Sequence, residues 1–173
     1  MLFEPNYNVE SIYDINIAEL KDTGIKALFF DLDSTLMKSK SGKFSFQTMQ
    51  FLNDLKTNFK LAIITHNSNV NYINKAKSQT DIPIYFEAKK PNPRVLLKAC
   101  RELGLNSDSV AMVGDRPLSD ILGGINAGMI TILVDSISKD EENFPLLDFI
   151  KVESKSKNKP CIPMLFSSAI SIS

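Results

Sequence analysis

The sequence predicts an α/β protein, a three-layer sandwich built around a five-stranded, mainly parallel sheet. Apolar, β-rich runs alternate with helical patterns along the chain. These runs are almost continuously apolar, as expected of strands that are covered on both faces. Because strands that alternate with helices are joined by right-handed crossovers, their carboxyl ends should meet at one edge of the sheet.

Each element follows from its own pattern. The five predicted strands are Ile25–Phe30, Lys60–Thr65, Ile82–Phe86, Val110–Gly114 and Ile130–Asp135. The predicted helices are Ser11–Thr23, Phe46–Asn58, Ser68–Gln79, a helix from Asn92-Pro93 to Leu103, and Leu118–Ala127. Asn92 is the expected cap of the helix in which Pro93 occupies the first turn, and Gly104 ends it.

Length and composition suit one domain over residues 1–150. Residues 151–160 are polar and read as a linker, and residues 161–173 form an apolar, Ser-rich tail that is either disordered, docked or an added edge strand. Lys plus Arg and Asp plus Glu balance at 20 each, so no nucleic-acid partner is expected. The beginning of the chain lacks a signal-peptide pattern and no apolar run reaches ~18 residues, which favours a cytoplasmic protein.

Two carboxylates follow the first predicted strand. In Asp31-Leu32-Asp33-Ser34-Thr35-Leu36, Asp31 and Asp33 stand at positions i and i+2. Residues so spaced in an extended segment point the same way, and unpaired acids beside a core are costly unless a cation or donors compensate them. The pair therefore suits a shared substrate and a metal ion, although a strand end that simply reaches solvent would also allow it.

Other strand ends supply the remaining groups for phosphoryl transfer, which needs an in-line nucleophile, a metal and fixed positive charge. Asp31 is the candidate nucleophile and Asp33 the candidate acid and base. Mg²⁺ prefers oxygen ligands, here the carboxylates of Asp31 and Asp115 and the backbone carbonyl of Asp33. Asp120 would bind the ion through water or orient Asp115. The hydroxyl and backbone N–H of Thr65 can bind phosphate, and Lys90 supplies the cation.

Taken singly, each of these elements is weak evidence, and their order along the chain carries the interpretation. His66 and Asn67 follow Thr65 directly and join Thr65 and Lys90 as candidate phosphate-binding residues. For His66 a positioning or structural role stays open.

These motifs resemble those of the haloacid dehalogenase-like (HAD) superfamily. Asp31–Leu36 is similar to its first motif, Thr65 to the second, Lys90 to the third and Gly114–Asp120 to the fourth. The resemblance implies a Rossmann-like sheet, dependence on Mg²⁺ and an aspartyl-phosphate intermediate on Asp31.

The segment Ser11–Ile15 and the run Asp120–Val134 also resemble the YqeG-type branch of subfamily IIIA, which is related to mitochondrial phosphatidylglycerophosphatase. The resemblance implies a phosphorylated substrate, either a small molecule or a lipid head group such as phosphatidylglycerophosphate.

Substrate access should be open. Only 31 residues separate Asp33 from Thr65, too few for a large cap domain, which leaves Ser39–Phe44 as a small flap.

A non-catalytic binding or scaffold protein and a phosphotransferase remain alternatives. Peripheral membrane contact is not favoured, because Ser11–Leu20 lacks a basic polar face. A homo-oligomer stays open.

Overall fold

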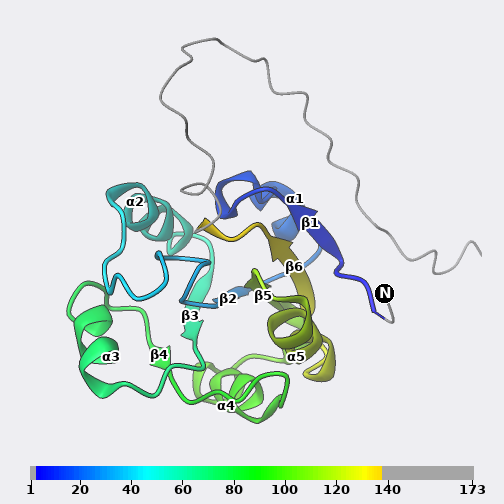
Figure 1. Ribbon diagram of the computed structural model, residues 1–173. Coiled ribbons are helices and arrows are strands. Elements are labelled where there is room, and N and C mark those ends of the chain that lie inside the picture. Colours follow the sequence, from blue (N-terminus) through cyan, green and yellow to red (C-terminus); the bar gives the residue numbers. More distant parts are fainter. Residues whose placement is uncertain (1–2, 138–173) are drawn as a thin grey trace, which may run out of the picture.

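The fold is organised around six parallel strands in the order β1-β6-β5-β2-β3-β4, seen in a computed structural model that describes residues 3–137 (Figure 1). The strands are β1 Tyr7–Val9, β2 Ala27–Phe30, β3 Lys60–Ile64, β4 Ile84–Tyr85, β5 Val110–Gly114 and β6 Ile130–Val134. The predicted linker and tail over residues 151–173 lie outside the described residues. The five predicted strands and their parallel arrangement are confirmed, and a sixth strand is added.

Helices cover both faces of the sheet, which gives the three predicted layers (Figure 1). They are α1 Ile17–Asp22, α2 Phe46–Leu55, α3 Val70–Lys77, α4 Arg94–Leu103 and α5 Leu122–Asn126. Short helical turns lie at Ile12–Asp14 and Ser107–Ser109, and Pro117–Ile121 has π-helical hydrogen bonding.

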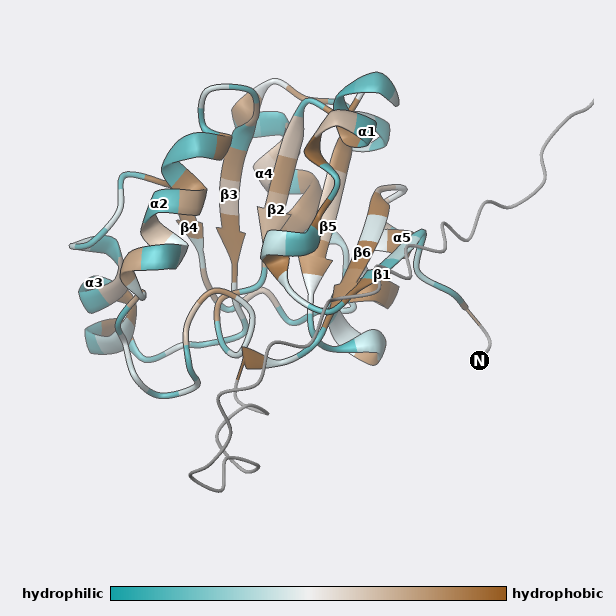
Figure 2. Ribbon diagram, turned by 90° about the horizontal axis from the view of Figure 1, so that it is seen from above, coloured by the Kyte–Doolittle hydropathy of each residue, from teal (hydrophilic) through white to brown (hydrophobic). Residues whose placement is uncertain are grey.

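The alternating side chains of β2 enter two separate apolar cores. Leu28 and Phe30 pack with residues of α1, α2 and α3, whereas Ala27 and Phe29 pack with residues of α4 and with Ala127, which follows α5. All four are fully buried, and Figure 2 shows the strands in brown between helices that are partly teal. Burial on both faces explains why the strands read as continuous apolar runs.

The sixth strand, β1, was not predicted. It pairs in parallel with β6, Tyr7 opposite Ile132, and the side chain of Asn6 accepts a hydrogen bond from the backbone N–H of Thr131 at 2.9 Å. A strand of three residues with a half-buried edge position is too short to show an apolar period.

The predicted helix Ser11–Thr23 is in fact two pieces. Ser11 caps the turn Ile12–Asp14 and Asn16 caps α1, each accepting a hydrogen bond from a backbone N–H two or three residues ahead. Two capping side chains so close together start separate helices instead of one.

Close packing of α5 on the sheet depends on a glycine. A Cβ atom at Gly124 would lie 2.6 Å from Cγ2 of Thr131 in β6 and 3.0 Å from Cβ of Met112 in β5. The neighbouring Gly123 is less crowded, with its nearest contact at 3.4 Å. The helix can therefore pack this closely on β5 and β6 only because residue 124 has no side chain.

Candidate active site

The loop after β2 carries the two leading carboxylates. Asp31 is buried and continues the sheet, since its N–H donates to the carbonyl of Val113 at 2.9 Å. Ser34 has a left-handed φ of 70°, and its N–H donates to the carbonyl of Met37 at 2.8 Å. The chain thus turns back immediately after Asp33, which keeps both acids at the carboxyl edge of the sheet. Ile137, at the end of the described chain, donates its N–H to the carbonyl of Ser34 at 2.9 Å.

Lys90 is the centre of the site. Its side chain has no exposed surface, and Nζ lies 2.6 Å from Oδ1 of Asp31 and 2.6 Å from Oδ1 of Asp120. A third contact, 2.9 Å long, joins Nζ to the carbonyl of Ile64 at the end of β3. Because an ammonium group has three protons, these three acceptors satisfy it completely.

The segment before α4 brings Lys90 to this position. Glu87 and Lys89 both have positive φ angles, and the N–H of Ala88 donates to the carbonyl of Thr65 at 3.0 Å. This bond ties the segment to the tip of β3. Asn92 accepts a hydrogen bond from the N–H of Arg94, but α4 itself begins one residue later than predicted, after Pro93.

The loop after β5 adds Asp115 and Asp120. Oδ1 of Asp115 accepts a hydrogen bond from the hydroxyl of Thr35 at 3.2 Å. Asp120 is fully buried, and its Oδ2 accepts from the N–H of Arg116 at 3.1 Å. A Cβ atom on Gly114 would lie 2.4 Å from Oδ2 of Asp120. The glycine and the wide turn Pro117–Ile121 together leave room for this carboxylate under the strand end.

Three carboxylates are close enough to hold one metal ion. Oxygen atoms of Asp31, Asp115 and Asp120 all lie within 4.8 Å of one another. A donor set made only of oxygens fits Mg²⁺. Both oxygens of Asp120 are already hydrogen-bonded, so Asp31 and Asp115 are better placed to bind an ion directly.

The surroundings change the pKa values of these groups. Burial, together with the negative charges of Asp120 and Asp115, raises the pKa of Asp31 to about 7 although Lys90 works in the opposite direction. Burial also raises the pKa of Asp115, with a further contribution from Asp120. Burial works to lower the pKa of Lys90, but Asp31 and Asp120 outweigh it and the pKa of Lys90 is raised. The electrostatics favour a cation among the carboxylates.

The carboxylate of Asp33 lies apart from the three that could hold a metal. Its Oδ2 accepts a hydrogen bond from the Thr65 hydroxyl at 3.4 Å, and its Oδ1 accepts one from the Tyr72 hydroxyl at 2.5 Å. This separation agrees with assigning the side chain of Asp33 to proton transfer and only its backbone carbonyl to the metal.

Thr65, His66 and Asn67 follow β3 at the same edge. The backbone N–H of Thr65 donates to the carbonyl of Tyr85 at 2.9 Å. The expectation that the N–H of Thr65 is available to bind phosphate was therefore wrong. The hydroxyl of Thr65 accepts from the N–H of Asn67 at 3.0 Å. The side chain of His66 is exposed at the surface, but its ring is partly desolvated. This desolvation and the charge of Lys90 lower the pKa of His66, Asp120 acts in the opposite direction, and Arg116 lowers the pKa further.

Sequence reasoning missed Tyr72. It stands in the first turn of α3, after the capping residue Asn69, and its aromatic ring packs against the core beside that helix. Burial and the hydrogen bond to Asp33 raise the pKa of Tyr72. The weak apolar period of this helix gave no indication of the direction in which the Tyr72 hydroxyl points.

The predicted flap is tied to Gln79, two residues beyond the end of α3. The side-chain nitrogen of Gln79 donates to the carbonyl of Gly42 at 2.9 Å, and the N–H of Phe44 donates to Oε1 of Gln79 at 3.2 Å. Residues between Asp33 and Thr65 otherwise form only α2 and β3.

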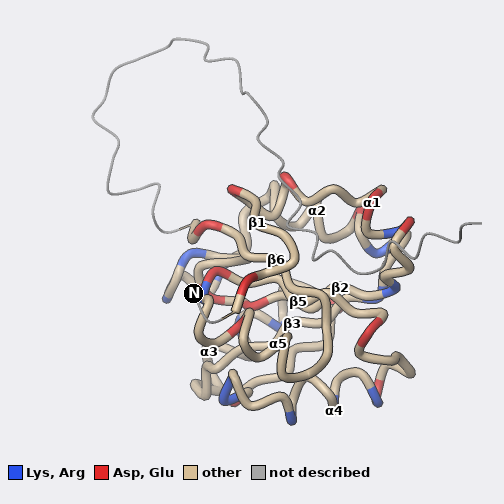
Figure 3. The backbone as a smooth tube through the Cα atoms, turned by 90° about the vertical axis from the view of Figure 1, so that its right-hand side faces the viewer, with Lys and Arg blue, Asp and Glu red and all other residues tan. Residues whose placement is uncertain are grey.

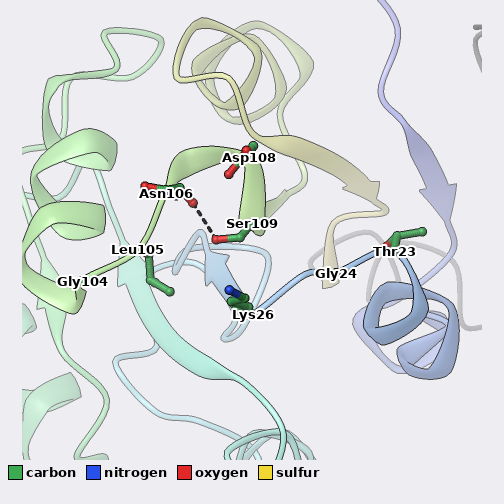
Figure 4. Close-up of a pocket in the computed structure, with 8 residues that line it drawn as sticks. All are labelled: Thr23, Gly24, Lys26, Gly104, Leu105, Asn106, Asp108 and Ser109. Atoms are coloured by element: carbon green, nitrogen blue, oxygen red, sulfur yellow. Dashed lines mark hydrogen bonds between the residues drawn. The ribbon is translucent and has the colours of Figure 1, made fainter.

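A polar hollow of about 390 Å³ lies at the opposite, amino edge of the sheet. Its lining includes Lys26, Asn106, Asp108 and Ser109, at the beginnings of β2 and β5 (Figure 4). None of the candidate site residues lines it. Along the backbone, charged residues are spread over helices and loops, and β2 and β5 carry none (Figure 3). The carboxylates that could hold a metal lie at the carboxyl edge, away from this hollow.

Comparisons with known proteins agree with this fold. A family model described as HAD-hydrolase-like matches residues 87–145. The D,D-heptose 1,7-bisphosphate phosphatase from B. bronchiseptica, solved with magnesium and phosphate, has a TM-score of 0.57 and 15% identity, covering 68% of this chain and 84% of that one. A protein from Listeria monocytogenes serotype 4b has a TM-score of 0.56 and 17% identity, covering 76% and 88%. At these identities the likeness shows the fold alone.

The chain is similar to HAD-like hydrolases, and its relatives carry the predicted enzyme class, that of a phosphatase. It is similar to the probable phosphatase YqeG of Bacillus subtilis, with 27% identity over 139 residues, which are 80% of this chain and 81% of that protein. The acid sugar phosphatase of Staphylococcus aureus is 51% identical over 47 residues, which are 27% of this chain but only 18% of that protein. Among the described residues no helix is both long and apolar enough to cross a membrane.

Proposed function

We propose that this protein is a Mg²⁺-dependent phosphomonoester hydrolase that acts through an aspartyl-phosphate intermediate on Asp31. The observation that carries the proposal is the buried Lys90, held at 2.6 Å by both Asp31 and Asp120 while Asp115 lies close to both acids. A structural ion pair needs only one carboxylate, whereas a surplus of buried negative charge suits a site that receives a cation.

Asp31 and Asp115, with the backbone carbonyl of Asp33, would hold the ion, and Asp120 would orient the surrounding groups. When bound, Mg²⁺ neutralises phosphate oxygens and offsets the charge that develops in phosphoryl transfer. Lys90 provides a fixed positive charge next to the nucleophile, and the Thr65 hydroxyl is a donor at the same edge of the sheet.

In the first step, the oxygen of Asp31 that does not bind Lys90 attacks phosphorus. The bond from phosphorus to the ester oxygen breaks, and the departing alcohol takes a proton from Asp33. In the second step Asp33 removes a proton from water, which attacks the same phosphorus. Inorganic phosphate leaves and the Asp31 carboxylate is restored.

Turnover of p-nitrophenyl phosphate with Mg²⁺ tests this mechanism. Asp31→Asn should lower kcat by at least about 1,000-fold, since the nucleophile is lost. Asp108→Asn, an exposed acid at the amino edge, is the matched control and should keep wild-type activity. Asp33→Asn should accumulate a phosphoryl group on the peptide that contains Asp31, seen by mass spectrometry after acid quenching. Equal rates for the wild type and Asp31→Asn would overturn the mechanism and favour the scaffold alternative.

For the substrate we favour a phosphate on a large or amphiphilic molecule, such as the lipid head group of phosphatidylglycerophosphate. Two helices that begin at the carboxyl edge expose apolar side chains, with Phe46 79% and Leu118 73% exposed. Apolar groups so placed can contact the non-phosphate part of a substrate.

The substrate class is testable with phosphatidylglycerophosphate in detergent micelles. The double variant Phe46→Ser, Leu118→Ser should lower kcat/KM for the micellar lipid and leave p-nitrophenyl phosphate hydrolysis unchanged. An equal effect on both substrates would argue against a lipid. Product analysis with an added alcohol distinguishes a hydrolase from a phosphotransferase, because a phosphotransferase would form a new phosphate ester with that alcohol.

A further inference from the structure

The hydroxyl of Tyr72 is placed to control the carboxylate of Asp33. It lies 2.5 Å from Oδ1 of Asp33, while the Thr65 hydroxyl lies 3.4 Å from Oδ2. Hydrogen bonds between hydroxyl and carboxylate oxygens are typically ~2.5–2.7 Å long, so the contact with Tyr72 is the stronger of the two.

Tyr72 is itself firmly held. Its backbone N–H donates to the side chain of Asn69, the cap of α3, at 3.1 Å. Its ring packs against the core between α3 and the sheet, and its hydroxyl also lies 3.3 Å from the sulfur of Met37. Met37 forms a backbone bridge with Asp33, so Tyr72 contacts both ends of the loop that carries the acid.

A general acid works only when its carboxyl group stands within hydrogen-bond reach of the leaving oxygen. Asp33 is half-buried in a tight loop. Its hydrogen bond with Thr65 is long, so Thr65 by itself would hold the carboxylate only weakly. We propose that Tyr72 is a positioning residue that fixes the side chain of Asp33 for proton transfer. This inference rests on the proposed role of Asp33 as acid and base.

The test measures kcat/KM for a series of phosphomonoesters with graded leaving groups, from p-nitrophenyl phosphate through phenyl phosphate to an alkyl phosphate. An alcohol that leaves easily needs little protonation, whereas an alkoxide depends on the acid. We expect Tyr72→Phe to lower kcat/KM by less than about 3-fold with p-nitrophenyl phosphate and by about 10- to 100-fold with the alkyl ester. The larger loss is a part of the rate enhancement that general acid catalysis supplies.

Tyr85→Phe is the matched control. The hydroxyl of Tyr85 donates to Glu102 at 2.8 Å, away from the candidate site, and the variant should match wild type across the series. A uniform loss for Tyr72→Phe on every ester would show a structural role only, and no loss on the alkyl ester would equally overturn the proposal.

Asp33→Asn separates this inference from the mechanism on which it rests. One outcome is that the loss of kcat/KM in Asp33→Asn grows steeply from p-nitrophenyl phosphate to the alkyl ester while the loss in Tyr72→Phe stays the same for every ester. That result would overturn the role of Tyr72 alone. If Asp33→Asn lowers kcat/KM equally for every ester, Asp33 is not the general acid and the role of Tyr72 falls with it, whereas the nucleophilic role of Asp31 is decided separately by Asp31→Asn.

Discussion

Lys90→Met should destabilise the protein strongly, although it removes only one charged group. Methionine keeps the length and the apolar stem of lysine. The substitution nevertheless leaves Asp31 and Asp120, both buried, without the cation that each contacts at 2.6 Å. Breaking a buried ion pair by removing one partner costs about 3–5 kcal/mol of unfolding free energy.

Urea unfolding at pH 8 without divalent metal measures this cost, and thermal unfolding gives a second estimate. For a domain of this size each kcal/mol corresponds to roughly 2–4 °C, so the melting temperature should fall by about 6–20 °C. Lys89→Met is the control, because Lys89 is the exposed neighbour in the same loop. It should stay within about 0.5 kcal/mol of wild type, as surface substitutions usually do.

The deficit of Lys90→Met should shrink as the pH falls from 8 to 5. Lys90 lowers the pKa of Asp31, which burial raises to about 7, so its removal should raise that pKa further. A carboxyl group whose pKa is higher in the folded than in the unfolded state adds most to the free energy of unfolding below its unfolded-state pKa. This contribution is lost as the pH rises through its folded-state pKa. A Lys90→Met protein as stable as Lys89→Met at pH 8 would refute the reasoning.

Three further outcomes follow from the structure. Asp31→Asn should be more stable than wild type by about 2–4 kcal/mol at pH 8, because the amide mimics the neutral acid, and this gain should vanish as the pH falls toward 4 in urea titrations. Gly124→Ala should lose about 1–3 kcal/mol by collision with Thr131, whereas Gly123→Ala, with ordinary contacts, should not lose stability in the same assay. Added Mg²⁺ should raise the melting temperature of wild type, and much less that of Asp115→Asn; equal shifts would exclude the carboxylate cluster as the binding site.

Much of the architecture could be predicted from local sequence. Strands such as β5 are buried on both faces, so their continuous apolar runs and the acids that follow them are visible in the sequence. Parallel pairing then brings Asp31, Thr65 and Asp115 to one edge without any knowledge of side-chain contacts.

Other features depend on contacts between distant segments. The strand β1 is recognisable only from its pairing with β6, and the hydroxyl of Tyr72 meets Asp33 from 39 positions away. The availability of the Thr65 N–H was misjudged for the same reason, since a two-residue strand, β4, supplies its acceptor. Sequence patterns report which side of an element is apolar, but not which donor finds which acceptor.

The hydrogen bond from Ile137 to Ser34 has a practical consequence for engineering this protein. Any reporter or affinity handle joined at residue 137 would start beside the loop that carries Asp31 and Asp33, close to the candidate site. Handles inserted around residues 104–109 would lie at the amino edge of the sheet, opposite the candidate site. Kinetic work on this chain is therefore best done with attachments kept away from the former position.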